Sequence, residues 1–253
     1  MNDLLLSKLR QLKLSGVVKS LETRNEQAIK EKLSYMEFIE LIISDEISNR
    51  QSNSKHNRIK KAKFPQLKTL EEYNFEFQPT INKRFIYDLG TCEFIRKKYN
   101  IAFIGPPGTG KTHLSIALGI KAVNQGYRVL FTTVSEMLQE LYMSRADNSF
   151  NTKLKYYIMP DLLILDELGL KKLNQNSVDD FYEVISKRYE RGSTIITSNK
   201  VFDEWGRIFY DSVLASAILD RFVHHCHFVL INGESYRMKE QEKFLTEIKE
   251  KEG

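Results

Sequence analysis

The chain has 253 residues, of which 42% are hydrophobic and 28% charged, the balance of a globular protein with one good-sized core and room for a small second module. No apolar run approaches the roughly 20 residues that span a bilayer, which excludes a helical membrane protein. Two cysteines, Cys92 and Cys226, are too few for a disulfide framework, and the first residues lack the basic start of a signal peptide. We therefore expect a cytoplasmic protein without a membrane partner.

The net charge of +5 is concentrated in the first third of the chain. Residues 1–85 contain 16 Lys and Arg against 11 Asp and Glu, whereas the remaining residues contain 22 of each. Solvated helix faces usually mix both signs, so a stretch with basic residues alone favours an anionic partner, most simply nucleic acid. A solvated helix face is the alternative interpretation. The basic residues of this stretch are Arg50, Lys55, Arg58, Lys60, Lys61 and Lys63.

Three helices are predicted at the start of the chain. Leucines recur at helical spacing in residues 2–14, residues 17–32 suggest a second helix, and Ser34 with Glu37 forms a capping-box pattern that begins a third. The third helix is expected to run to about residue 62, because Phe64-Pro65 ends it. We expect residues 1–68 to form a small, basic, DNA-binding helical domain and residues 69–253 to form a second domain.

From about residue 76 the pattern changes to strands that alternate with helices. This alternation predicts an α/β fold with a parallel sheet and helices on both of its faces. The expected strands are 101–104, 128–132, 161–166, 193–198 and 227–231. The expected helices are 83–98, 111–124, 135–145, 177–190 and 212–224, with another after 235.

The turn after the first strand has the pattern G-x-x-x-x-G-K-[ST], typical of a phosphate-binding loop. Its glycines allow backbone N–H groups to surround an anion, and the following helix directs its positive end at the same point. Lys111 would reach the terminal phosphates, and the Thr112 hydroxyl would hold Mg²⁺. The expected nucleotide contacts are Gly105, Pro106, Pro107, Gly108, Thr109, Gly110, Lys111, Thr112 and His113.

The strand expected at 161–166 ends in two acidic residues. Carboxyl ends of parallel strands are where open α/β sheets bind ligands. Asp166 would join the Mg²⁺ shell through water, and Glu167 would act as the base that polarises an attacking water. Asn199 follows the next strand and would orient that water near the γ-phosphate. Together these residues predict nucleoside triphosphate hydrolysis.

Other candidates carry a weaker signal. Arg221 lies late in a predicted helix, where spacing alone favours a pairing with Asp220 or the helix dipole over a catalytic role. The run from His224 to His227 suggests a metal cluster, but no second group of ligands stands at zinc-like spacing, so we expect none. In a strand, His225 and His227 would share one face while Cys226 points away. Trp205 and its aromatic neighbours favour core packing.

The order of these motifs resembles IstB, the AAA+ helper ATPase of insertion sequences, which is related to the DnaC and DnaI helicase loaders. The phosphate loop and the acidic strand are shared by many families, whereas the later motifs are more specific. The resemblance covers nearly the whole chain. Its motifs are Gly105 to Leu114, Leu162 to Gly169, Thr197-Ser-Asn199, Trp205-Gly, Ala217 to Arg221 with the two histidines, and Gly233-Glu-Ser-Tyr-Arg237.

The resemblance implies roles that spacing does not provide. Arg221 matches an arginine finger that completes a neighbouring subunit's site, so the active form is expected to be a homo-oligomer with active sites at subunit interfaces. Arg237 matches the sensor 2 position. The implied cofactors are ATP and Mg²⁺. The implied partners are duplex DNA, bound with little sequence specificity, and a transposase that the protein directs or activates.

Two other functions remain open at this stage. One is a replicative helicase loader, and the other is a DNA-bending scaffold that uses ATP only to assemble. Glu167 argues against a pure scaffold, because nucleotide binding alone does not need a second acid. If the basic stretch does not bind DNA, Lys153 and Lys155 are the next candidates.

Overall fold

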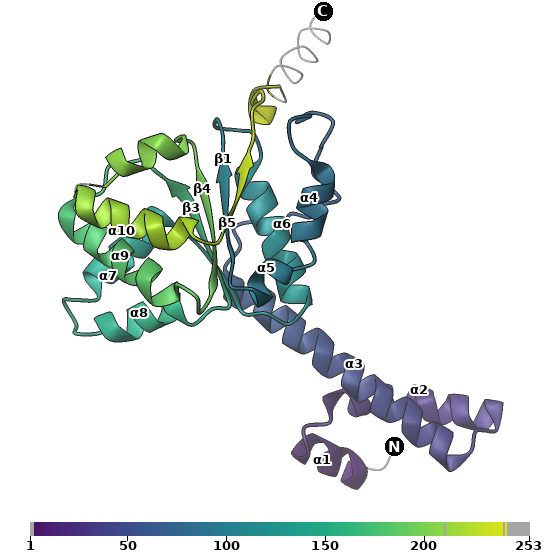
Figure 1. The fold of residues 1–253 in the computed structure, drawn as a ribbon. Helices are drawn as coiled ribbons and strands as arrows, with labels where there is room; N and C mark the ends of the chain where they lie inside the picture. The colour runs from purple at the N-terminus through teal and green to yellow at the C-terminus, as the bar shows by residue number, and fades with distance from the viewer. Residues whose placement is uncertain (1–2, 210, 240, 242–253) are drawn as a thin grey trace, which may run out of the picture. The chain divides into compact units, whose positions relative to one another are not determined.

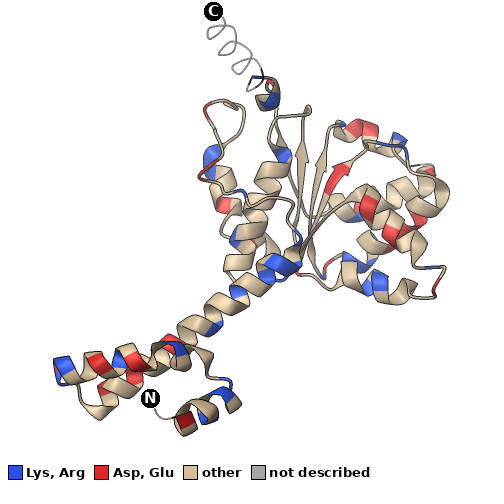
Figure 2. Cartoon of the chain, turned by 180° about the vertical axis from the view of Figure 1, so that it is seen from behind, with Lys and Arg blue, Asp and Glu red and all other residues tan. Residues whose placement is uncertain are grey.

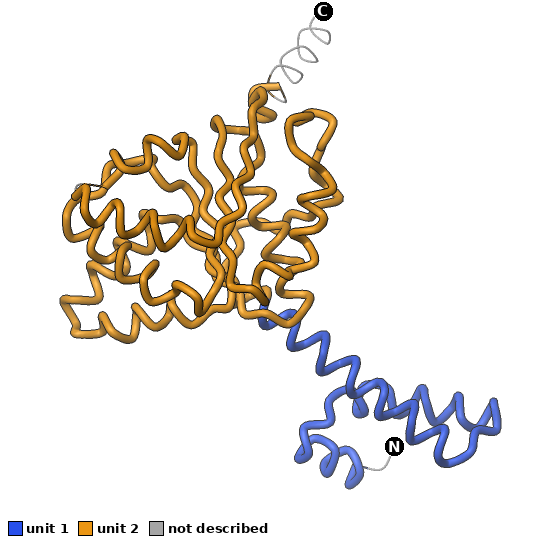
Figure 3. Tube along the Cα trace, in the orientation of Figure 1, with its two compact units in different colours: residues 1–58 blue, residues 59–253 orange. Residues whose placement is uncertain are grey.

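The computed structural model describes residues 3–209, 211–239 and 241, and its contacts divide the chain into two compact units, residues 1–58 and 59–253 (Figure 3). The sequence placed the division later, after residue 68. The difference arises because Ala62 is fully buried in the core of the second unit, with Ile59 and Phe64 packed against the same core. No helix in the described ranges has the length and apolarity needed to cross a membrane.

The first unit is helical, as predicted. It contains α1 (Asp3–Gln11), α2 (Ser15–Glu31) and most of α3 (Tyr35–Ala62). The capping box at the start of α3 is present: the Ser34 N–H donates to Glu37 Oε2 at 2.7 Å, and the Glu37 N–H donates to Ser34 Oγ at 3.3 Å. The helix ends before Phe64-Pro65, in agreement with the prediction.

A buried carboxylate joins the second and third helices within this unit. Glu46 is 4% exposed and accepts hydrogen bonds from the N–H groups of Gly16 at 2.6 Å and Val17 at 3.1 Å, two of the unpaired donors in the first turn of α2. A Cβ at Gly16 would lie 2.7 Å from the Glu46 Cα, so only glycine permits this approach. Arg24 pairs with Asp45 through two bonds of 2.8 Å, and this pairing lowers the pKa of Asp45 to about 2.

The second unit is built on a five-stranded parallel sheet in the order β2-β3-β4-β1-β5 (Figure 1). The predicted α/β class is therefore confirmed, and each predicted strand is present with small differences at its ends. The third is longer, and its register with β4 shifts between Leu165 and Leu168. The strands are β1 (Asn100–Ile104), β2 (Val129–Thr133), β3 (Leu162–Leu168), β4 (Ser193–Ser198) and β5 (Cys226–Leu230).

Helices cover both faces of the sheet (Figure 1). Successive strand residues point to opposite faces, so Phe103 packs in the core beneath α6, and Ala102 and Ile104 pack in the core on the other side. One face is covered by α4 (Lys83–Leu89), α5 (Glu93–Arg96) and α6 (Lys111–Asn124). The other is covered by α7 (Val134–Met143), α8 (Phe150–Ile158), α9 (Gln175–Arg188) and α10 (Ser212–Val223).

The single helix predicted over residues 83–98 is wrong. The chain forms α4 and α5 separately, because Cys92 between them adopts a left-handed conformation with φ +61° that a continuous helix does not allow. Two further elements were not predicted, α8 and the 3₁₀ helix η1 (Phe202–Arg207). The last helix, expected after residue 235, begins at residue 236, and the rest of this prediction falls largely outside the described residues.

Candidate nucleotide-binding site

The loop between β1 and α6 has the backbone that an anion site requires. Gly108 and Gly110 have φ angles of +79° and +89°, which L side chains rarely adopt. A Cβ at Gly108 would collide with the side chain of Ser235, and one at Gly110 would collide with the ring of Tyr73. Glycine is thus needed both for the loop's conformation and for the close approach of its neighbours. The loop leads directly into the first turn of α6, where N–H groups lack helical partners.

Lys111 is held inside this loop. Its side chain is 8% exposed, and Nζ donates to the carbonyl oxygens of Gly105 and Pro106, both at 2.7 Å. Burial lowers the pKa of Lys111, while the nearby charge of Asp166 opposes that shift. A buried ammonium group whose bonds go to carbonyl oxygens retains an uncompensated charge, so the loop fits an anionic phosphate chain.

Thr112 and Asp166 meet, as the sequence predicted. Thr112 Oγ1 lies 2.9 Å from Asp166 Oδ1 and 3.0 Å from Oδ2, and the carboxylate is 5% exposed at the carboxyl end of β3. Thr197, on the adjacent strand β4, donates a short hydrogen bond to the same carboxylate. Hydroxyl and carboxylate oxygens are the ligands that Mg²⁺ prefers, so this donor set fits Mg²⁺ beside the phosphate loop.

Glu167 follows Asp166 directly, in the irregular part of β3 where the register with β4 shifts. Its φ of +66° is left-handed, its side chain is exposed, and its N–H donates to Thr197 Oγ1 at 3.0 Å. One threonine therefore holds the buried acid through its hydroxyl hydrogen and the exposed acid's backbone through its oxygen. No role for Thr197 was predicted from the sequence. Its signal was the polar residue near the end of an apolar strand, two positions before Asn199.

A cleft of about 670 Å³ opens over the phosphate loop. One wall comes from residues 65–78, where the Tyr73 hydroxyl donates to the Thr109 carbonyl at 2.9 Å. His113 also lines the cleft, and its Nε2 lies 2.7 Å from the Thr69 carbonyl. Arg237 also lines the cleft, so this predicted contact lies beside the loop.

The remaining predicted residues lie at two different ends of the sheet. Asn199 directly follows Ser198, the last residue of β4. Ser198 pairs with Ile104, which precedes the phosphate loop, and with Leu168, which follows the two acids. Asn199 therefore lies at the nucleotide end of the sheet. Arg221 is at the opposite end, in the helix that leads into the start of β5. Arg221 bonds the carbonyl of Ala217 at 3.0 Å and lies 5.3 Å from the ring of Tyr182, instead of pairing with Asp220.

The histidine run has the arrangement expected of a strand. His225 stacks on Tyr99 at 4.9 Å and His227 lies 5.7 Å from the same ring, whereas Cys226 packs in the core on the other face. Trp205 is 1% exposed and packs in the same core, as predicted; its neighbour Tyr210 lies outside the described residues.

The predicted DNA-binding residues differ in their surroundings. Arg50 pairs with Glu46 at 2.7 Å, and Arg58 donates to Ser54 at 2.7 Å. Lys63 lies past the end of α3, with Nζ 5.3 Å from the ring centroid of Tyr156 in the second unit. Basic positions without acidic neighbours continue along the second half of α3 (Figure 2). The exposed lysines there are Lys55, Lys60 and Lys61.

Two features define a P-loop protein of the AAA+ class. The first strand of a parallel sheet leads into a glycine-rich phosphate loop, and a buried acid at the end of β3 bonds the loop's threonine. Comparisons with known proteins agree. Residues 7–244 match the family described as IstB-like ATP binding protein. The chain therefore belongs to this ATP-binding family.

Individual relatives match over almost their whole length. The chain is 42% identical over 241 residues to the insertion sequence IS21 putative ATP-binding protein of Pseudomonas aeruginosa, covering 95% of this chain and 90% of that one. It is also 42% identical over 227 residues to the insertion sequence IS5376 putative ATP-binding protein of Geobacillus stearothermophilus, with 90% of each chain covered. A crystal structure of DnaI has a similar fold, with a TM-score of 0.56 and 22% identity over 65% of this chain and 90% of that one.

Proposed function

We propose that this protein is an Mg²⁺-dependent ATPase that assembles on duplex DNA with little sequence preference and directs a partner transposase to it. The observation that carries the ATPase part is the shared Thr197 contact. It holds Asp166 against Thr112 and, at the same time, fixes the backbone of Glu167. The relatives' names associate them with insertion sequences, and this supports the role in transposition.

Each residue of the site has a distinct part in the proposed reaction. Lys111 exchanges its two carbonyl partners for the terminal phosphates, which neutralises their charge where solvent is excluded. Thr112 and Asp166 would hold Mg²⁺, which when bound neutralises charge on the phosphoryl oxygens. Glu167 takes the proton from the attacking water. Its side chain is exposed, and its contact with Thr197 is made by the backbone N–H and not by the carboxylate. Asn199 orients that water, and Arg237, which lines the cleft, contacts the phosphates.

The position of Arg221 supports an assembly of several copies. A residue at the amino end of β5 is far along the sheet from the chain's own phosphate loop, so Arg221 would serve the nucleotide of a neighbouring copy. Such an arginine stabilises charge on the transferred phosphoryl group. Hydrolysis would then require a homo-oligomer with its active sites at subunit interfaces.

The exposed lysines of α3 support DNA binding. Positive side chains without neighbouring acids attract phosphates irrespective of base sequence, which fits a protein that accepts many target sites. The likeness to DnaI favours a helicase loader as the second candidate, but it concerns the fold alone. The two functions differ in substrate: a loader would prefer single strands and bind a ring helicase, whereas the proposed helper prefers duplex DNA.

Two variants test the ATPase assignment. Lys111→Ala should lose ATP binding, because the phosphate chain loses its buried cation. Glu167→Gln should keep ATP binding and slow phosphate release by roughly 10²–10⁴-fold, because the amide has the same shape but accepts no proton. Glu204→Gln is the matched control, since that carboxylate lies outside the cleft near Lys200 and should leave both quantities unchanged. A wild-type rate in Glu167→Gln would show that the catalytic assignment is wrong.

A further inference from the structure

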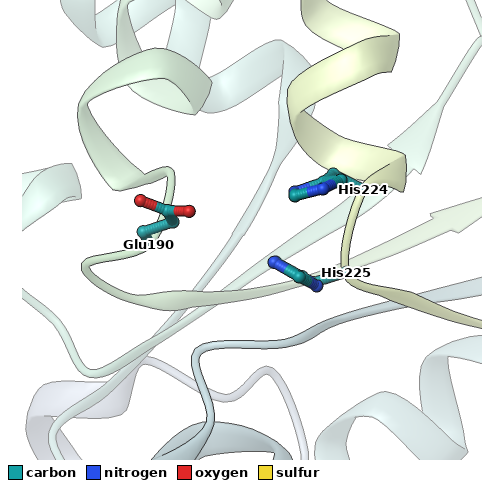
Figure 4. Close-up of side chains that lie close together, drawn as sticks. All are labelled: Glu190, His224 and His225. Carbon is teal, nitrogen blue, oxygen red and sulfur yellow. The ribbon is translucent and has the colours of Figure 1, made fainter.

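Glu190, His224 and His225 form a cluster outside the nucleotide cleft (Figure 4). Glu190 lies in the turn between α9 and β4, whereas the two histidines join α10 to β5. One ring nitrogen of each histidine and one carboxylate oxygen lie within 4.8 Å of one another. No metal was expected here, because the sequence has no second group of ligands at zinc-like spacing. The fold supplies that group from a residue more than thirty positions earlier in the chain.

Neighbouring side chains already orient the two imidazole rings. The Tyr189 hydroxyl lies 2.9 Å from Nδ1 of His224, and the ring of His225 stacks on Tyr99 with an interplanar angle of 2°. The two imidazole centroids are 4.0 Å apart. Metal-binding histidines usually have their second ring nitrogen hydrogen-bonded, which fixes the tautomer that ligates. In the tautomer whose Nδ1–H donates to the Tyr189 oxygen, Nε2 of His224 is the nitrogen left for an ion.

We propose that Glu190, His224 and His225 bind one divalent transition-metal ion, with Zn²⁺ as the best match. Two imidazole nitrogens, one carboxylate oxygen and a water make the four-coordinate set that Zn²⁺ adopts at sites with an open position. Bond lengths near 2.0–2.1 Å require ligand atoms roughly 3.3 Å apart. Because the ligand atoms lie within 4.8 Å of one another, the side chains must close by at most about 1.5 Å. Glu190 and His224 are exposed, so their side chains are free to make this movement.

The ligand atoms of the cluster decide which ions it selects. Lys98, Arg188 and Arg221 line the small cavity beside it, and their field disfavours every divalent cation alike. Mg²⁺ and Ca²⁺ prefer oxygen ligands, of which only the Glu190 carboxylate is present among the three side chains. Imidazole nitrogen favours Zn²⁺, Cu²⁺ and Ni²⁺. The cluster should therefore select a transition metal in the presence of millimolar Mg²⁺, in contrast to the Thr112–Asp166 pair.

An ion at this position would join two segments that are distant in sequence. It would fix the turn after α9 to the last turn of α10, close to Arg221. Because only the folded chain brings the three ligands together, ion binding stabilises the folded state. A hundredfold excess of free ion over Kd corresponds to a rise in Tm of roughly 5–10 °C for a unit of this size.

The test measures Zn²⁺ binding to the full chain. The protein is stripped with a chelator, and Zn²⁺ is titrated in competition with a chromogenic chelator in millimolar Mg²⁺. We expect one ion per chain, an affinity at least tenfold lower in Glu190→Gln and in His224→Gln, and about a tenfold loss in Tyr189→Phe. His56→Gln, which changes an exposed histidine in the first unit, is the matched control and should bind Zn²⁺ like the wild type.

Nucleotide binding measured on the same samples shows that each variant is folded. The rise in Tm should disappear in Glu190→Gln and persist in His56→Gln. Two results would overturn the proposal: wild-type Zn²⁺ affinity in His224→Gln, or a chain that binds no Zn²⁺ at micromolar concentration although it binds nucleotide.

Discussion

Replacing Arg188 with methionine should destabilise the second unit strongly, because this guanidinium is 1% exposed and forms a hydrogen-bond hub between α8, α9 and β4. Burial lowers its pKa, and no carboxylate within the described residues forms an ion pair with it. The charge is instead compensated by oxygen dipoles. The five acceptors are the carbonyls of Tyr157, Ile158, Pro160 and Ser193 and the hydroxyl of Thr194.

The size of the effect follows from those acceptors. Each buried acceptor left without a partner costs about 1 kcal/mol or more, so the gross loss for five is roughly 5 kcal/mol. Methionine no longer buries a charge, and this offsets part of the loss. We expect the free energy of unfolding to fall by about 3 kcal/mol. Gly192→Ala should weaken the same hub by about 1–2 kcal/mol, because a Cβ there would lie 2.8 Å from Arg188 Nη2.

The assay is urea unfolding followed by fluorescence of Trp205, the single tryptophan, which is buried in the second unit and therefore reports on that unit alone. Arg191→Met is the matched control: it removes an exposed arginine three residues away and should change the free energy of unfolding by less than 0.5 kcal/mol. A loss below about 1 kcal/mol in Arg188→Met would refute the reasoning, since it would mean that the acceptors find other partners.

Three further predictions follow from the structure. Arg221→Ala should bind ATP yet hydrolyse it slowly. Mixing it with Lys111→Ala should restore part of the phosphate release, because mixed interfaces pair one intact loop with one intact arginine. If mixed assemblies form and phosphate release is not restored, the role of Arg221 in trans is contradicted. Replacing Lys60 and Lys61 with alanine should reduce the magnitude of the log–log salt slope of duplex binding by up to about 1.8 for two unrelated sequences, whereas the exposed pair Lys171 and Lys172 serves as the control. An unchanged slope would return α3 to a solvated helix and move the DNA contacts to Lys153 and Lys155. Asp45, paired with Arg24, has a pKa of about 2 against an ordinary value of 3.8. Its contribution to the stability of the first unit is therefore present above pH 4 and is lost as the pH falls toward 2. In Asp45→Asn, the acid unfolding followed by circular dichroism should lack the loss of stability between pH 4 and pH 2.

The sequence was sufficient for those parts of the site that lie close together along the chain or at matching strand ends. The pattern from Gly105 to Thr112 specifies its own backbone, and the rule that parallel strands end at one edge of the sheet was enough to bring Asp166 to Thr112. The same reasoning placed Asn199 at that edge. The alternation of predicted strands with predicted helices was enough for the class of fold.

Contacts that depend on tertiary packing were not accessible in this way. The break before α5 rests on a left-handed Cys92, a conformation that residue type does not predict. The bond between Thr197 and Asp166 depends on the register of β3 against β4, which the sequence does not specify. Glu190 approaches the histidines because the turn after α9 and the end of α10 lie together, and no spacing rule connects them.

The phosphate loop is also braced by two segments from the beginning and the end of the second unit. Tyr73 bonds the loop at Thr109, and the Tyr236 N–H donates to the carbonyl of Gly108 at 3.0 Å. The two bracing segments also bond each other, through Gln78 Nε2 and the Glu234 carbonyl at 2.9 Å. A ligand that tightens the loop therefore tightens a closed ring of contacts, so amide hydrogen exchange should slow together in residues 73–82 and 232–237, and loosening either segment should weaken nucleotide affinity without any change in the loop's own sequence.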